Sequence, residues 1–124
     1  MFLLHSTDDD RQQPWEYLPC SAMTPKYGMA MLLSSGKLAK ASGSATPEYI
    51  CVREEAASVA AGTVIPVIKI QKDQVFETTG PSSALTVGTG YDIGSDGLSI
   101  ASTTSGGAFV LLSQDGTNIR GRFA

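Results

Sequence analysis

Short apolar stretches separated by turn residues dominate the pattern along the chain. Residues 29–33 and 37–41 flank a Ser-Ser-Gly turn, and apolar and charged positions alternate in the second stretch. Two extended runs around such a turn predict a β-hairpin. Residues 49–52 begin a further strand. The alanine-rich segment 54–62 is too short to hold a helix by itself, so we expect one turn or a loop there.

The most apolar strand candidate is the segment 63–70, which reads Thr-Val-Ile-Pro-Val-Ile-Lys-Ile. Side chains alternate along a strand, so Ile65 and Val67 point to one face while the other apolar residues point to the opposite face. A strand that is apolar on both faces needs cover on both. Pro66 lacks the N–H that a ladder uses, which predicts an edge or a bulge. We therefore expect a homo-oligomer in which a neighbouring subunit covers Ile65 and Val67.

Glycine-rich turns recur through residues 80–124. Asp-Gly pairs at 96–97 and 115–116 precede alternating runs, which is the strongest local signal for hairpins. The expected strands are 85–87, 91–93, 98–100, 108–112 and 118–123. In the last of them, Ile119, Gly121 and Phe123 share one face, and Arg120 and Arg122 share the other. The turns have no fixed period, so they indicate a β-meander or a small barrel.

Residues 1–19 form a polar, irregular zone in which Pro14 and Pro19 prevent a stable helix. We predict an extended N-terminal arm at 1–19 and a single β-rich domain at 20–124. Trp15 either folds back onto its own domain or anchors on a partner. Tyr17 and its neighbours complete the candidate binding residues of the arm, which are Pro14, Trp15, Tyr17 and Leu18. Deletion of the arm is expected to leave the thermal melt nearly unchanged and to abolish attachment.

Composition narrows the class of protein further. The 124 residues suit one domain, and the net charge of −3 excludes a basic nucleic-acid footprint across the whole chain. No apolar run approaches the ~20 residues of a membrane helix, and the first residues do not resemble a signal peptide. Cys20 and Cys51 form no CxxC motif and indicate reduced thiols in a protein made in the cytoplasm, with a single disulfide as the alternative.

Catalytic groups are sparse, since His5 is the single histidine. The glycine-rich segment 88–94 spaces its third glycine one position late for a dinucleotide fingerprint, and no helix is expected after it. The aspartates near glycines do not have the spacing of a calcium loop, so we interpret Asp92, Asp96 and Asp115 as turn residues. The S-x-x-K match of Ser34 and Lys37 falls in the expected hairpin turn. We expect no enzyme, no cofactor and no metal.

Five segments follow one another in an order that is similar to a known family. They are Ser21–Pro25 (Ser-Ala-Met-Thr-Pro), Met31–Leu38, Ile50–Val52 with its alanine-rich link, Val64–Ile70 and Val75–Glu77. In this order the chain from about Ala22 to Thr79 resembles the small head-decoration proteins of tailed bacteriophages, of the kind that cement the capsid of lambda-like phages. The resemblance covers just under half of the chain, and residues 80–124 are longer and richer in glycine than the family pattern.

The resemblance implies a β-tulip-like or small barrel domain with at most one short helix, a trimer and no catalysis. It implies a virion protein, made in the bacterial host cytoplasm, that binds the major capsid protein on the outside of the expanded shell through its arm. Neither nucleic acid nor a membrane is an expected partner. The alternatives are another tail or head-tail module of a phage, and a cellular small β-barrel adaptor or ligand-binding domain.

Overall fold

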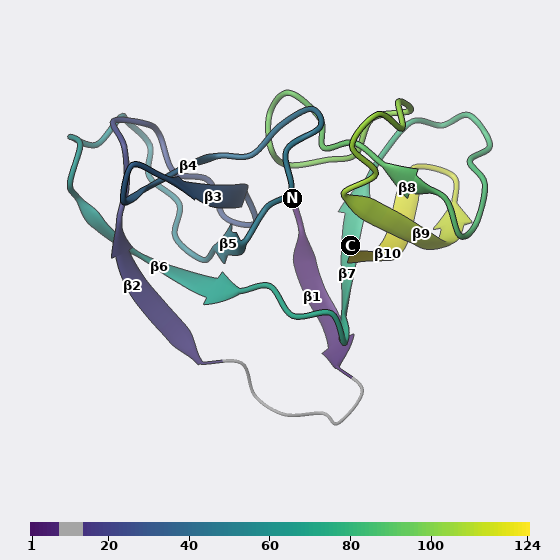
Figure 1. Cartoon of the computed structure of the whole chain (residues 1–124), viewed down its shortest axis with the longest axis horizontal. Coiled ribbons are helices and arrows are strands. Elements are labelled where there is room, and N and C mark those ends of the chain that lie inside the picture. Colours follow the sequence, from purple (N-terminus) through teal and green to yellow (C-terminus); the bar gives the residue numbers. More distant parts are fainter. Residues whose placement is uncertain (8–13) are drawn as a thin grey trace.

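The computed structural model describes residues 1–7 and 14–124. Alternating apolar and polar residues in these ranges form ten strands and no helix. The strands form two open antiparallel sheets of five strands each, which stand side by side in Figure 1. Sheet A has the order β1 (Leu3–Thr7), β7 (Gln74–Thr79), β10 (Asn118–Phe123), β9 (Phe109–Asp115) and β8 (Gly90–Tyr91). Sheet B has the order β2 (Trp15–Pro19), β6 (Val64–Lys69), β5 (Tyr49–Cys51), β3 (Ala30–Ser34) and β4 (Lys37–Lys40).

The predicted mainly β fold is confirmed, but the predicted small barrel is wrong, because neither sheet closes on itself. Sheet B comes nearest to closure. Cys20, which follows β2, forms one parallel bridge with Leu38 of β4, and the Ser21 N–H donates to the Leu38 carbonyl oxygen with 2.9 Å between nitrogen and oxygen. This bridge curls sheet B without continuing into a ladder.

Two predicted hairpins are confirmed because their turns are encoded locally. The β3–β4 turn pairs Ser34 with Lys37 and places Ser35 and Gly36 at φ 52° and 78°, the positive values that a two-residue type I′ turn needs at both positions. The β9–β10 hairpin pairs Asp115 with Asn118. Along β10 the residues Ile119, Gly121 and Phe123 are buried while the two arginines between them are not, as the alternation predicts.

Two expected strands in the C-terminal part do not form. Residues 85–87 form a loop because their backbone N–H groups bond to side chains: Leu85 donates to Gln114 Oε1 over 2.8 Å, and Thr86 donates to the Tyr91 hydroxyl over 2.8 Å. Residues 98–100 make only isolated bridges, at Ser99 and Ile100. Residues 54–62 form the expected loop.

The core has two clusters, one on each face of sheet B. The first joins the two sheets: the rings of Phe2, Phe76, Phe109 and Phe123 from the sheet A side pack with residues such as Ile50 and Ile68 from sheet B. Neighbouring rings in this cluster have centroids 5.0–5.5 Å apart in tilted or T-shaped pairs. The second cluster lies within the curl of sheet B and contains Cys20, Met31, Leu38, Ile65 and Val67, with Val59 of the 54–62 loop packed against it.

Ile65 and Val67 are therefore buried completely within one chain. The reason for expecting a subunit interface at these residues is wrong, because the curl of sheet B and its flanking loops cover the second face of β6. The segment is a strand with buried residues on both faces, as its two-sided apolar pattern predicts. The cover comes from the same chain.

Pro66 also departs from its expectation, because β6 lies inside sheet B between β2 and β5, and no bulge interrupts its pairing with β2. The Pro66 carbonyl oxygen accepts from the Val52 N–H over 3.1 Å, so its nitrogen also faces the β5 side. Strand β5 ends at Cys51, one residue before Val52. The missing donor therefore falls where the ladder with β5 has already ended.

The described parts of residues 1–19 are strands of the two sheets, so the expectation of a separate extended arm is wrong for these residues. Strand β1 pairs with β7, and the Phe2 N–H donates to the Gly28 carbonyl oxygen over 2.8 Å. Strand β2 pairs with β6 over all five of its residues. Residues 8–13 of the predicted arm lie outside the described residues.

Candidate functional site

Strand β2 presents two large aromatic side chains at the edge of sheet B. Trp15 and Tyr17 are 56% and 65% exposed, and neighbouring β6 contributes Val64, which is 51% exposed. In the register of the two strands Trp15 lies opposite Ile68, Tyr17 opposite Pro66 and Pro19 opposite Val64, so these residues share one face. We call the surface formed by Trp15, Tyr17 and Val64 the aromatic ribbon.

The backbone of β2 is open on the side away from β6. The Cys20 N–H donates to Thr63 and the Cys20 carbonyl accepts from Gly62, so even-numbered residues of this segment face β6. The N–H and C=O groups of Trp15 and Tyr17 therefore point outward. No strand of the described chain pairs with them there, because β2 is terminal in the sheet order. The aromatic ribbon thus adjoins an open sheet edge.

The structure brings only some of the predicted site residues together. Trp15 and Tyr17 lie side by side on one face, and exposed Pro14 precedes them. Leu18 has the opposite parity and packs, partly buried, against the second core cluster. Because Leu18 faces away from the two aromatic residues, it does not belong to their surface.

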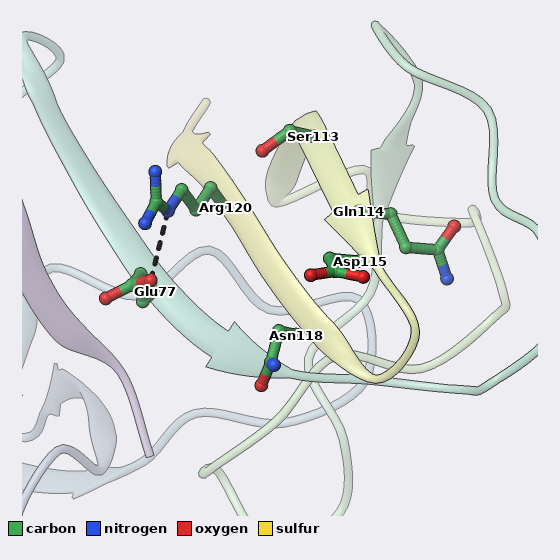
Figure 2. Close-up of a pocket in the computed structure, with 6 residues that line it drawn as sticks. All are labelled: Glu77, Ser113, Gln114, Asp115, Asn118 and Arg120. Carbon is green, nitrogen blue, oxygen red and sulfur yellow. Dashed lines mark hydrogen bonds and ion pairs between the residues drawn. The ribbon is translucent and has the colours of Figure 1, made fainter.

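A second surface, which the sequence did not predict, lies on the face of sheet A that points away from the core. A hollow of about 410 Å³ is lined by residues of β7, β9 and β10, namely Glu77, Ser113, Gln114, Asp115, Asn118 and Arg120. The Gln114 side chain itself points away from the hollow, because Gln114 lies opposite the buried Ile119. Figure 2 shows the Glu77–Arg120 ion pair beside the hollow, with 3.0 Å between Arg120 Nε and Glu77 Oε1. We call this surface the polar hollow.

The Gln114 side chain holds the loop of residues 81–85. Its Nε2 group donates to the carbonyl oxygens of Ser83 and Gly116 over 2.9 and 3.1 Å, and its Oε1 atom accepts from Leu85. These bonds tie residues 81–85 to the β9–β10 hairpin. The Gln114 side chain is thereby engaged by the protein and does not face a ligand in the polar hollow.

Asp92 is a buried carboxylate that organises the neighbouring loop. Its two oxygens accept hydrogen bonds from the hydroxyls of Thr103 and Ser105 and from the N–H groups of Gly106 and Gly107, at 2.7–3.2 Å. The bonds from Ser105, Gly106 and Thr103 lower the pKa of Asp92 to about 2 from its ordinary 3.8. Asp92 has all its acceptor capacity engaged by the protein, so its role is structural.

The Asp92 carboxylate should make stability depend on pH in the acidic range. Its pKa is lowered by folding, so between about pH 4 and pH 2 the unfolded chain binds a proton that the folded chain does not. The contribution of Asp92 to the free energy of unfolding should therefore be complete above pH 4 and be lost as the pH drops towards 2. We expect Asp92→Asn to show a smaller fall in Tm over this interval than the wild type, with Glu54→Gln as the exposed control. Equal slopes for the wild type and Asp92→Asn would contradict this.

The thiols and the acidic residues offer no further site in the described part of the chain. Cys20 and Cys51 are free and buried, and burial raises the pKa of both thiols. The Cys51 thiol donates to the Arg53 carbonyl oxygen over 3.1 Å. Within residues 1–7 and 14–124, no three His, Cys, Asp or Glu side chains are grouped to hold a metal ion.

Comparisons with known proteins leave the chain without an assigned relative. No family model matches it, and neither a curated protein nor a solved structure is significantly similar. Nothing in the described residues forms a helix of the length and apolarity needed to cross a membrane.

Proposed function

We propose that this chain is a structural virion protein, not an enzyme, that binds the outer surface of an expanded phage capsid and stabilises it. The single observation that carries the proposal is the aromatic ribbon on the open edge of sheet B. The order of segments between Ala22 and Thr79, which resembles head-decoration proteins, supports the same function. The proposal includes a β-tulip-like fold of the domain, as in that family.

The aromatic ribbon has the properties of a protein-binding surface. Trp and Tyr are enriched among the residues that dominate binding energy at interfaces, and each commonly contributes ~2 kcal/mol or more. Trp15 and Tyr17 expose most of their side chains to water, although their backbone is fixed in a sheet. The partner thus makes apolar contacts with side chains whose strand is already ordered, so little conformational entropy is lost on binding. The outward N–H and C=O groups of β2 can also pair with an extended segment of the coat protein.

Stabilisation of the shell follows from selective binding. A protein that binds the expanded shell and not the immature one shifts the equilibrium towards the expanded state by mass action. Many copies on a closed shell then act together, so modest affinity per copy is sufficient. Cytoplasmic synthesis in the bacterial host and a final place on the outside of the virion are parts of this proposal.

Self-association into a trimer belongs to the proposal through the family resemblance alone. Ile65 and Val67 are buried within the single chain, so they do not contribute to it. Sedimentation of the purified protein at high micromolar concentration measures the oligomeric state directly.

The test of the proposed function uses expanded, undecorated phage shells assembled from a major coat protein. The double variant Trp15→Thr/Tyr17→Thr retains residues that favour strands. At ~2 kcal/mol for each side chain, its affinity for the shells should fall at least about 100-fold, measured by co-sedimentation. Tyr27→Thr is the matched control, because Tyr27 is also an exposed aromatic residue but lies outside the ribbon.

Circular dichroism and a thermal melt of both variants establish that the fold is retained. If the wild type does not bind the shells, the capsid function is wrong. If the wild type binds and the double variant binds equally well, the capsid contact lies elsewhere than the aromatic ribbon.

A further inference from the structure

In the polar hollow, side chains and not unpaired backbone groups are available to a ligand. Strand β10 is paired on both sides, with β7 and β9, so its N–H and C=O groups are used within the sheet. Side chains of opposite parity, such as Ile119 and Phe76, point into the first core cluster. A ligand in the polar hollow therefore meets only the outward side chains of these strands.

Most of the hydrogen-bonding groups around the polar hollow are unused. Arg120 bonds to Glu77 through Nε, and its terminal nitrogens make no hydrogen bond to another described residue. The same is true of the side chains of Ser113, Asp115 and Asn118 within the described chain. Figure 2 shows Asp115 and Asn118 next to each other at the end of the hairpin, with Ser113 further along β9. Donors and acceptors thus face the same space.

The charges around the polar hollow disfavour an ionic ligand. Two carboxylates, of Glu77 and Asp115, accompany one guanidinium, of Arg120. An anion such as phosphate would approach the Asp115 carboxylate. A divalent cation would find only two carboxylates, with the Arg120 guanidinium beside them, and no three acidic, His or Cys side chains of the described residues are grouped to hold a metal ion. A neutral ligand that both donates and accepts hydrogen bonds avoids these costs.

An apolar surface adjoins the polar hollow. A second hollow of about 210 Å³ shares Glu77 and Asn118 with it and is lined on its other side by Met1 and Leu3. Both of these apolar residues are partly exposed. Sugar rings present hydroxyl groups at their rim and C–H groups on their faces. The combination of paired donors and acceptors with an apolar wall matches this chemistry, and the volume of the polar hollow falls in the range of small-molecule sites.

We propose that the polar hollow on sheet A binds a neutral carbohydrate of one or two sugar units. The Asp115 carboxylate accepts hydrogen bonds from ring hydroxyls, and the Asn118 amide both donates to them and accepts from them. The terminal nitrogens of Arg120 donate to a hydroxyl oxygen, and Leu3 contacts the C–H face. Glu77 is a positioning residue that holds the guanidinium of Arg120 through its ion pair. This inference is independent of the aromatic ribbon, which lies on the other sheet.

The experiment is a titration of the 15N-labelled protein followed by heteronuclear NMR. The probes are methyl glycosides of glucose, galactose, mannose and N-acetylglucosamine at millimolar concentrations, with glucuronic acid and N-acetylneuraminic acid as acidic comparators. We expect at least one neutral glycoside to shift the amide signals of Ser113, Asp115, Asn118 and Arg120. The Asp115→Ala/Asn118→Ala variant should weaken that binding tenfold or more.

Thr117→Ala is the matched control, since Thr117 is exposed in the same hairpin but does not line the hollow. It should bind as the wild type does. The inference is overturned if no neutral glycoside binds, if only the acidic sugars bind, if the shifts lie away from the polar hollow, or if the double variant binds unchanged. The signal dispersion of the double variant shows whether it has kept the fold, and Ser113→Ala provides a milder second variant with an expected weakening in the same direction.

Discussion

Replacement of Phe2 by alanine is expected to lower the free energy of unfolding by about 3–5 kcal/mol, the usual cost of removing a fully buried ring. Phe2 is only 1% exposed. Its ring lies 5.5 Å from that of Phe109 and 5.1 Å from that of Phe123, measured between centroids. Because these rings are held by β9 and β10, they can fill only part of the space that the substitution leaves.

Urea denaturation of Phe2→Ala measures this loss, with Leu4→Ala, two residues further along the chain, as the matched control. Leu4 is 37% exposed, so its truncation should cost well under half as much. If Phe2→Ala loses as little stability as is expected of Leu4→Ala, Phe2 does not belong to the core. The same result would restore the expectation that residues 1–19 are dispensable for folding.

The sequence could not predict the place of residues 1–7, for a physical reason. The segment pairs with β7, whose residues lie about seventy positions further along the chain, and local periodicity contains no information on such a partner. The register also shifts between Leu4 and Ser6, which breaks the simple alternation that marks a strand. The prolines at 14 and 19 excluded a helix correctly, but proline is tolerated at the edge of a sheet, where β2 lies.

Features encoded over short distances were predictable. The β3–β4 and β9–β10 hairpins follow from turn residues between alternating runs, and the buried and exposed faces of β10 follow from parity alone. The strand at β6 followed from its apolar residues. What covers Ile65 and Val67 did not, because the covering residues come from Cys20, Met31 and Leu38, which meet β6 only after sheet B has curled.

The two candidate surfaces also differ in how far the sequence predicts them, because one depends on neighbouring residues and the other on distant ones. Trp15 and Tyr17 stand out in the sequence as aromatic residues in a polar segment, and alternation separates Leu18 from them once the segment is known to be a strand. The polar hollow needs three strands to meet, and the pairing of Glu77 in β7 with Arg120 in β10 spans 43 residues. Its one local signal is the parity that places Asn118 and Arg120 on the outward face of β10.

Gly121 lies where the rings of the first core cluster approach the sheet most closely. A Cβ atom there would contact the Val110 carbonyl oxygen and would come within 2.5 Å of Phe109 Cε1. The Phe109 ring is held against Phe2 and Phe123, so it has little room to move aside. Glycine is required at this position by the close approach of a neighbouring strand and ring.

Gly121→Ala is therefore expected to destabilise the protein by about 1–3 kcal/mol, the usual cost of overpacking a core. In the double variant Phe2→Ala/Gly121→Ala, the loss in free energy of unfolding should be smaller than the sum of the two single losses by at least about 0.5 kcal/mol. The reason is that the Phe109 ring can move into part of the space that Phe2 vacates. Gly121→Ala combined with Leu4→Ala is the control and should be additive, since Leu4 is not part of the ring cluster. Denaturant titration of the single and double variants measures both couplings. Strict additivity in both pairs would show that Phe109 does not transmit the clash, and that only the Val110 backbone excludes a side chain at Gly121.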